Sequence, residues 1–198
     1  MTELLKSADS FDLLIVGSIF ILALVLLWIL LRIRSSKDVD ALIRSAGNET
    51  LANFLIPDGN DGEIHIEYAL LSPRGVIVID VKDVKGHVFG SDAMQDWTVI
   101  SDKRRFTFNN PQHGLYDRMA AIKRLLPDVP VTGFVAFTEQ ADFSKGRPSN
   151  VAILEKLVSE LQKEKRVRRA ESLDRFLPNW DRLRHEAVAA QVGQLLRN

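Results

Sequence analysis

The sequence predicts a mixed α/β domain behind one membrane-spanning helix, and three observations lead to this prediction. An uncharged apolar run lies near the N-terminus, two strand-like segments are joined by a tight turn, and segments with helical apolar spacing flank them. We therefore divide the chain into a short extracytoplasmic N-terminus, a transmembrane helix, an α/β domain and a C-terminal helical extension, at residues 1–12, 13–33, 34–150 and 151–198.

The composition fits one globular domain with a small attachment. The chain has 198 residues, of which 46% are hydrophobic and 26% are charged. Lys and Arg number 26, as do Asp and Glu, so the formal net charge is zero. Strong non-specific nucleic-acid binders usually carry a basic excess, so any nucleic-acid site here must be a local patch. The absence of cysteine excludes disulfides, thiolate catalysis and Cys-based zinc sites.

Residues 13–31 form an uncharged run, LLIVGSIFILALVLLWILL, that is long enough to cross a bilayer. A helix of this length spans roughly 28 Å. A cleaved signal peptide is the alternative, but here acidic residues precede the run and Arg32 and Arg34 follow it. Trp28 suits the membrane interface, and the positive-inside rule places everything after Arg34 in the cytoplasm. We expect a single-pass protein of the cytoplasmic (inner) membrane that contacts the bilayer through residues 13–33.

Strand-like segments form the centre of the predicted domain. Residues 36–55 precede them and have helical spacing with a break at Gly47. Apolar and polar residues alternate over residues 63–70, and the β-branched run 76–81 is typical of a buried strand. Pro and Gly place a tight turn at residues 72–75 between them. Further strand material is expected at residues 88–89 and 97–100, and residues 106–108 are a short apolar piece.

A helix is predicted to begin at Asn110 and Pro111, because Asn favours the N-cap and Pro the first helical position. Residues 131–137 have the composition of another buried strand. Two more helical faces follow, at residues 154–161 and 188–196. The expected order is therefore a helix, a three-strand meander, a helix, a strand and then helices.

The predicted hairpin brings charged side chains together at one end. Residues at i and i+2 of a strand face the same way, so Asp80 and Lys82 share a face. The turn pairs Leu71 with Val76 and therefore, by counting, Glu67 with Asp80. Two carboxylates and one ammonium group are thus expected side by side at the end of an apolar strand.

Such a cluster has the groups that phosphodiester hydrolysis needs. Carboxylate oxygens bind Mg²⁺, which keeps several of its waters. The metal polarises a phosphoryl oxygen and lowers the pKa of bound water, while Lys82 can orient that water or stabilise developing charge. The structural alternative is an ion-pair network at a sheet edge, which contributes little stability when exposed. The four His residues have no zinc-binding spacing.

Several motifs over roughly residues 40–140 carry a family resemblance. They are Gly47-Asn48-Glu49, Ile66-Glu67, Gly75, Val78-Ile79-Asp80-Val81-Lys82, Gly86, Trp97 and Asn110-Pro111. This pattern resembles the nuclease-related domain (NERD) family, a branch of the PD-(D/E)XK nuclease-like folds. The resemblance implies a restriction-endonuclease-like αβββαβ core, here with additional C-terminal helices.

The resemblance also implies roles for individual residues. Glu67 and Asp80 would bind Mg²⁺ or Mn²⁺, Lys82 would be the catalytic lysine, and Glu49 on the first helix would be an accessory acid. The substrate would be DNA or RNA. The family usually has Asp where this chain has Glu67 and Glu where it has Asp80, and its Gln after the helix-opening Pro is Gly114 here. The alternative is a catalytically weakened module that binds nucleic acid or a protein partner at the membrane.

Residues 163–169 contain five basic residues in the run KEKRVRR. This run could contact nucleic-acid phosphates or the anionic cytoplasmic leaflet. It could equally be a solvated helix face.

Overall fold

The structure is a computed structural model that describes residues 19, 21–28, 38–59, 62–102, 104–167 and 171–197. The chain divides into two compact units, residues 1–41 and 42–198. In the first unit, residues 21–28 are helical and their large apolar side chains are exposed. Much of the predicted span at 13–33, with its flanking arginines, falls outside the described residues. Among those that are described, no helix is both long and apolar enough to cross a membrane.

The second unit contains two sheets. The main sheet has the strand order β1-β2-β3-β7-β9, in which β1, β2 and β3 form an antiparallel meander and β7 and β9 run parallel to β3. Its strands are β1 (Glu49–Pro57), β2 (Glu63–Ser72), β3 (Gly75–Lys82), β7 (Val131–Phe137) and β9 (Val151–Ile153). The smaller sheet has the order β6-β5-β4-β8. Its strands are β4 (Gly86–Phe89), β5 (Asp96–Ser101), β6 (Arg104–Asn109) and β8 (Ala141–Asp142).

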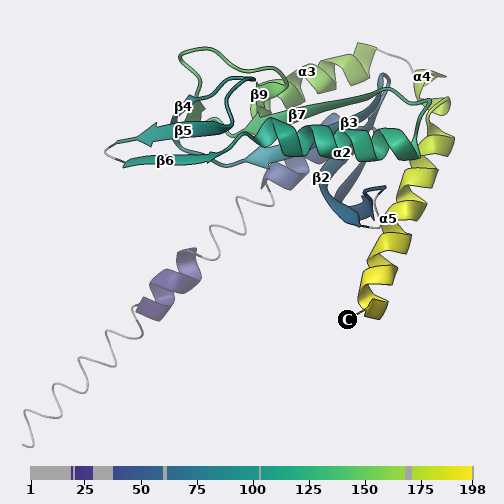
Figure 1. Cartoon of the computed structure of the whole chain (residues 1–198), viewed down its shortest axis with the longest axis horizontal. Coiled ribbons are helices and arrows are strands. Elements are labelled where there is room, and N and C mark those ends of the chain that lie inside the picture. The colour runs from purple at the N-terminus through teal and green to yellow at the C-terminus, as the bar shows by residue number, and fades with distance from the viewer. Residues whose placement is uncertain are drawn as a thin grey trace, which may run out of the picture. The chain divides into compact units, whose positions relative to one another are not determined.

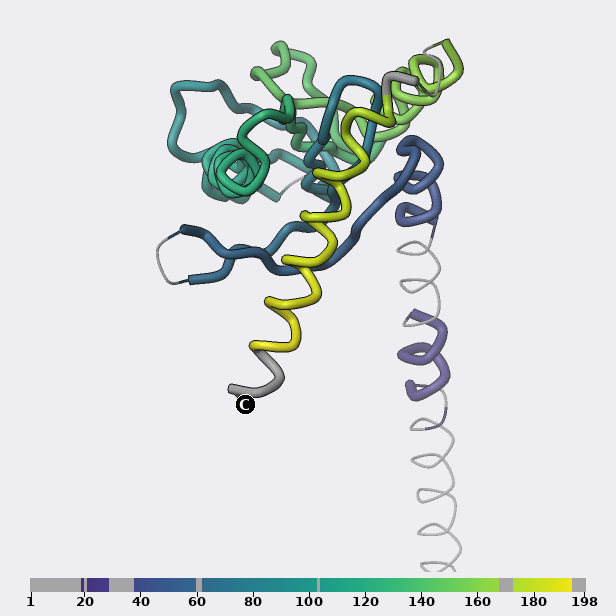
Figure 2. The backbone as a smooth tube through the Cα atoms, turned by 90° about the vertical axis from the view of Figure 1, so that its right-hand side faces the viewer, coloured from purple at the N-terminus to yellow at the C-terminus, as the bar shows by residue number. Residues whose placement is uncertain are grey.

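Four labelled helices complete the unit. They are α2 (Pro111–Leu125), α3 (Leu154–Val167), α4 (Glu171–Asp174) and α5 (Leu177–Arg197). Helix α2 lies along the main sheet, and the hairpin β5–β6 extends beyond the sheet and helices (Figure 1). Helix α5 packs on β1 and continues away from it toward the C-terminus (Figure 2). The mixed α/β prediction is confirmed.

The hairpin β2–β3 has the predicted turn and register. Ser72 pairs with Gly75 and Leu71 with Val76. The Ser72 hydroxyl donates to the Gly75 carbonyl over 3.0 Å and accepts from the Arg74 N–H at 3.2 Å. Gly75 has φ +121°, and a Cβ there would lie 2.2 Å from the Pro130 carbonyl oxygen. Only glycine fits this turn, which fixes the register of every side chain that follows.

The helix predicted over residues 36–55 is wrong in its second half. Residues 42–46 are helical in this unit, but Glu49–Pro57 is strand β1. Phe54 and Ile56 are buried and alternate along the strand, and β1 pairs with β2 over most of its length. This pairing satisfies the backbone hydrogen-bonding groups of β1 and buries its apolar face. These two gains outweigh the helical tendency that the local apolar spacing suggests.

The main sheet has the predicted order of elements, but its meander includes β1, which was predicted to be helical. The order is a helix at residues 42–46, then β1, β2, β3, α2 and β7, which matches αβββαβ. The strand material expected at residues 88–89 and 97–100, and the apolar piece at residues 106–108, form β4, β5 and β6 of the smaller sheet. Strands β4, β5 and β6 are therefore inserted between β3 and α2, while the fourth strand of the smaller sheet, β8, follows β7.

Aromatic packing joins the two sheets. Trp97 on β5 is fully buried and stacks on Phe137 of β7, with ring centroids 6.2 Å apart. Phe108 on β6 meets the Trp97 ring edge-on at 6.1 Å. A contact between large buried rings is worth about 1 kcal/mol beyond the area it buries. The packing therefore holds the base of hairpin β5–β6 against the end of the main sheet.

Candidate functional site

Glu67 is held at the point where β2 and β3 separate. The last pair of this ladder is Tyr68 with Ile79, and continuing the register places Glu67 opposite Asp80. One carboxylate oxygen of Glu67, Oε2, accepts a 2.8 Å hydrogen bond from the Val81 N–H. The Glu67 carboxylate thus takes the place of a backbone acceptor for the Val81 N–H. This hydrogen bond holds the carboxylate beside the end of β3.

Asp80 is a buried carboxylate with one paired and one unpaired oxygen. The residue is only 3% exposed. Its Oδ2 accepts from Arg118 Nη1 at 3.0 Å, and the same guanidinium donates through Nε to the His65 carbonyl at 2.8 Å. Its Oδ1 is buried and has no hydrogen-bond partner among the described residues. A buried carboxylate oxygen without a protein partner is energetically unfavourable, so a cation or a water bound at this atom would stabilise it.

The two carboxyls have raised pKa values for the same main reason. Burial raises the pKa of Asp80, while the positive charges of Arg118 and Lys82 act in the opposite direction. Burial also raises the pKa of Glu67, against the Val81 hydrogen bond and the charge of Lys82, and Asp80 raises it further. The Lys82 and Arg118 charges therefore act on both carboxyls.

A pocket of about 500 Å³ opens beside this cluster. The end of β3, strand β6 and the first turns of α2 surround it. Its lining residues are Asp80, Lys82, Val84, Phe106, Phe108, Asn109, Asn110, Pro111, Gly114 and Arg118. Lys82 is the last residue of β3 and faces the same side as Asp80, as the strand spacing predicted. The structure thus brings Glu67, Asp80 and Lys82 to one end of β3.

The start of α2 is fixed by its predicted cap. The Asn110 side chain accepts from the Gln112 N–H at 2.9 Å and donates to the Met94 carbonyl at 2.9 Å, and Pro111 is the first helical residue. Further along, a Cβ on Gly133 of β7 would lie 2.6 Å from Met119 Sδ. The cap and this close approach set how α2 lies over the sheet, and hence where its side chains reach β3.

Arg118 is the site residue that sequence reasoning missed. It lies one helical turn after Gly114, and a Cβ on Gly114 would be 2.7 Å from Arg118 Nη1. The departure from the family pattern at Gly114 therefore leaves room for the guanidinium. The neighbouring Gln112 is engaged elsewhere, since its amide donates to Asp92 and to the Ser149 carbonyl. No motif marks Arg118, because its role depends on how α2 docks.

Glu49 does not lie where the sequence placed it. It is on β1, not on the first helix, and it pairs with Leu71. Along β2 this is about 13 Å from the level of Glu67, at about 3.3 Å per residue. Its Oε2 accepts from Trp180 Nε1 at 2.8 Å and is also paired with Arg184. Glu49 thus ties β1 to α5, and the expected accessory acid does not join Glu67 and Asp80.

The carboxylates present fit a hydrated divalent ion better than a closed metal site. In the part of the chain that the structure describes, no three His, Asp or Glu side chains are grouped to hold a metal. The unpartnered Oδ1 of Asp80 and the raised pKa values of Asp80 and Glu67 show carboxylates that a cation would stabilise. Mg²⁺ commonly uses only one or two protein carboxylates, with water and phosphate as its other ligands.

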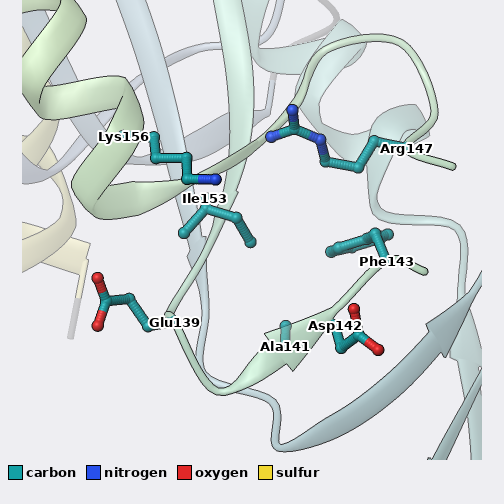
Figure 3. Close-up of a pocket in the computed structure, with 7 residues that line it drawn as sticks. All are labelled: Glu139, Ala141, Asp142, Phe143, Arg147, Ile153 and Lys156. Atoms are coloured by element: carbon teal, nitrogen blue, oxygen red, sulfur yellow. The ribbon is translucent and has the colours of Figure 1, made fainter.

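A second pocket of about 490 Å³ lies beyond the ends of β7 and β9 and contains none of the predicted site residues. Arg147 and Lys156 lie on one side of it and Glu139 and Asp142 on the other, with Ile153 between them (Figure 3). The two positive and two negative side chains balance one another. This pocket therefore lacks the positive bias that would favour a polyanion.

The comparisons with known proteins identify the family of this chain. The sequence profile of the nuclease-related domain (NERD) family matches residues 33–138, more than half of the 198 residues. The chain belongs to the nuclease-related domain family. An uncharacterized protein of Bacillus anthracis is 29% identical over 73 residues, which are 36% of this chain and 34% of that protein. This NERD chain thus covers about a third of that relative, and no solved structure matches it significantly.

Proposed function

We propose that this NERD protein is a membrane-anchored, Mg²⁺-dependent nuclease that hydrolyses phosphodiester bonds of DNA or RNA at the cytoplasmic face of the membrane. The observation that carries the proposal is the juxtaposition of Glu67, Asp80 and Lys82 at the end of β3. The membership of the nuclease-related family supports the reaction class. The uncharged run at residues 13–31 and the arginines after it support the anchor and its orientation.

The chain's own groups suit in-line attack of water on a phosphodiester. The water oxygen forms a bond to phosphorus, the ester P–O bond breaks, and the leaving oxygen takes up a proton. Asp80 Oδ1 and Glu67 would hold the divalent ion, and Mn²⁺ would be accepted in place of Mg²⁺. When bound, such an ion supplies polarisation of a phosphoryl oxygen and a lowered pKa of coordinated water. Lys82 would orient the attacking water and stabilise negative charge that develops on the phosphoryl oxygens.

One observation favours a second candidate function. Arg118 already pairs with Oδ2 of Asp80, so a guanidinium occupies an oxygen that a metal could otherwise use. A pocket with Lys82 and Arg118 on its wall would still bind a phosphate. The alternative is therefore a NERD module that binds nucleic acid without cleaving it.

Cleavage by matched variants tests the proposal. Purified full-length protein is incubated with supercoiled and single-stranded DNA and with RNA, in Mg²⁺, Mn²⁺ or EDTA. We expect metal-dependent cleavage that falls at least about 100-fold in Asp80→Asn and in Lys82→Ala. The first variant removes a carboxylate that would hold the ion, and the second removes the ammonium group that would stabilise charge on the phosphoryl oxygens. Asp83→Asn and Lys85→Ala are the controls, since both side chains are exposed in the loop after β3.

The outcomes separate the two functions. Cleavage that survives both Asp80→Asn and Lys82→Ala would remove the assigned site. Salt-sensitive binding with no cleavage in any metal would favour the binding module.

A further inference from the structure

The face of hairpin β5–β6 that looks toward the candidate site has an unusual exposed aromatic residue. Phe106 on β6 is 47% exposed, although it lines the same pocket as Asp80 and Lys82. Its ring lies 6.4 Å from that of Phe108, which is partly buried against Trp97. A large aromatic ring left open to solvent beside a charged pocket is a surface suited to stacking.

The strand geometry places a positive charge on the same face. Residues two apart on β6 share a face, so Arg104, Phe106 and Phe108 point one way and Arg105 points the other. These three side chains form a row, in which successive residues lie about 6.6 Å apart along the strand. The row therefore leads from the pocket outward: Phe108 at the pocket, then Phe106, then the exposed guanidinium of Arg104.

The hairpin is built to hold this row in a fixed position. Its base is packed through Trp97 against Phe137 of the main sheet. β5 and β6 are paired along their whole length, from Asp96 with Asn109 to Ser101 with Arg104. The hairpin extends beyond the sheet and helices, and β6 is the outer strand of its sheet (Figure 1). The exposed row is thus accessible and rigid at its base.

We infer that hairpin β5–β6 is a stacking platform for an unpaired nucleotide of the substrate, with a base on Phe106 and the neighbouring phosphate at Arg104. The inference deepens the proposed function, since it assumes a nucleic-acid substrate at the pocket, and it assigns the preferred substrate as single-stranded. A phosphate at the pocket faces Lys82 and Arg118, so cations lie at both ends of the row and an aromatic ring lies between them. This alternation matches the backbone and bases of a single strand, whereas paired bases in a duplex offer no free face for stacking.

Binding measurements on the full-length protein test the platform without requiring cleavage. Fluorescence anisotropy in EDTA is followed with labelled oligonucleotides: single-stranded DNA, single-stranded RNA, an abasic single strand and a blunt duplex. We expect Phe106→Ala to weaken binding of single-stranded DNA roughly tenfold, and Phe106→Tyr to retain it, because a stacked base contributes on this scale. The comparison of DNA and RNA identifies which chain is preferred.

The hairpin supplies its own controls on the opposite face. Ile100 is 38% exposed and pairs with Arg105, so both lie away from the row. We expect Ile100→Ala and Arg105→Ala to change binding less than about twofold, and Arg104→Ala to weaken it and to reduce its salt dependence. Loss of the Phe106 effect on the abasic strand and on the duplex would support stacking.

Several results would overturn the inference. They are equal losses in Phe106→Ala and Ile100→Ala, equal effects on duplex and single strand, or no binding to any oligonucleotide. The inference and the proposed hydrolysis fail separately. Phe106-dependent binding without cleavage would support the stacking platform and contradict the nuclease proposal. Asp80-dependent cleavage that does not depend on Phe106 would support the nuclease proposal and contradict the stacking platform.

Discussion

The guanidinium of Arg118 on α2 donates a 3.0 Å hydrogen bond to Oδ2 of Asp80, the buried carboxylate at the end of β3. The pair joins a helix to the centre of the main sheet at the wall of the candidate pocket. It compensates part of the cost of burying Asp80, and it competes with any cation for the same carboxylate. The consequences for stability and for metal binding can be measured separately.

Asp80→Asn is expected to change how stability depends on pH. Burial raises the pKa of Asp80 above its ordinary 3.8, so its carboxyl contributes stability below that pH and loses it as pH rises through the folded-state pKa. Urea unfolding of the metal-free protein in EDTA, at several pH values, checks this. The variant should gain stability relative to wild type as pH rises through this window. The exposed Asp128→Asn is the control, and a difference that stays constant with pH would contradict the prediction.

Arg118→Ala should destabilise the fold by about 2 kcal/mol, because it leaves a buried carboxylate without its charged partner. The value is below that of a fully buried pair, since the Arg118 side chain is 27% exposed. Adding Asp80→Asn should recover part of the loss, as the neutral amide is less costly to bury. Urea unfolding of the two single variants and the double variant gives the coupling. Strict additivity would show that the pair contributes nothing.

Glu67→Gln and Glu67→Ala are expected to separate structure from metal binding. A Gln carbonyl can still accept from the Val81 N–H, so only the Ala variant should lose stability, by about 1–2 kcal/mol. Both remove a carboxylate, so both should weaken Mn²⁺ binding at least about tenfold. Calorimetry with Mn²⁺ and urea unfolding check the two effects. Wild-type Mn²⁺ affinity in Glu67→Gln would rule out Glu67 as a ligand.

Glu49→Gln tests the reassignment of Glu49 from accessory acid to structural tie. The carboxylate accepts from Trp180 and pairs with Arg184, away from the pocket. The amide loses the charge, so we expect a loss of up to about 1 kcal/mol in unfolding free energy, because the site is partly exposed. Cleavage rates at saturating Mg²⁺ should stay within about twofold of wild type. A cleavage loss comparable with that of Asp80→Asn would restore Glu49 to the catalytic centre.

Local patterns were enough to predict the hairpin and its charged end. The Pro and Gly of residues 72–75 specified a tight turn, and a period of two then fixed that Asp80 and Lys82 share a face. The cap of α2 was equally local, because Asn110 satisfies an N–H two residues on. Strand β1 was not predictable in this way. Its spacing suited a helix, and only pairing with β2 made the extended form favourable.

The sequence by itself determined the uncharged run near the N-terminus, the register of hairpin β2–β3 and the place of Asp80 and Lys82 on one face, because these depend on residues close together in the chain. Only the tertiary structure decided that Arg118 pairs with Asp80, that Glu49 binds residues of α5, and that Phe106 is exposed beside the pocket. Each of these depends on how distant elements dock. Docking is set by packing over the whole core, such as Met119 against Gly133 and Trp97 against Phe137, which no local spacing encodes.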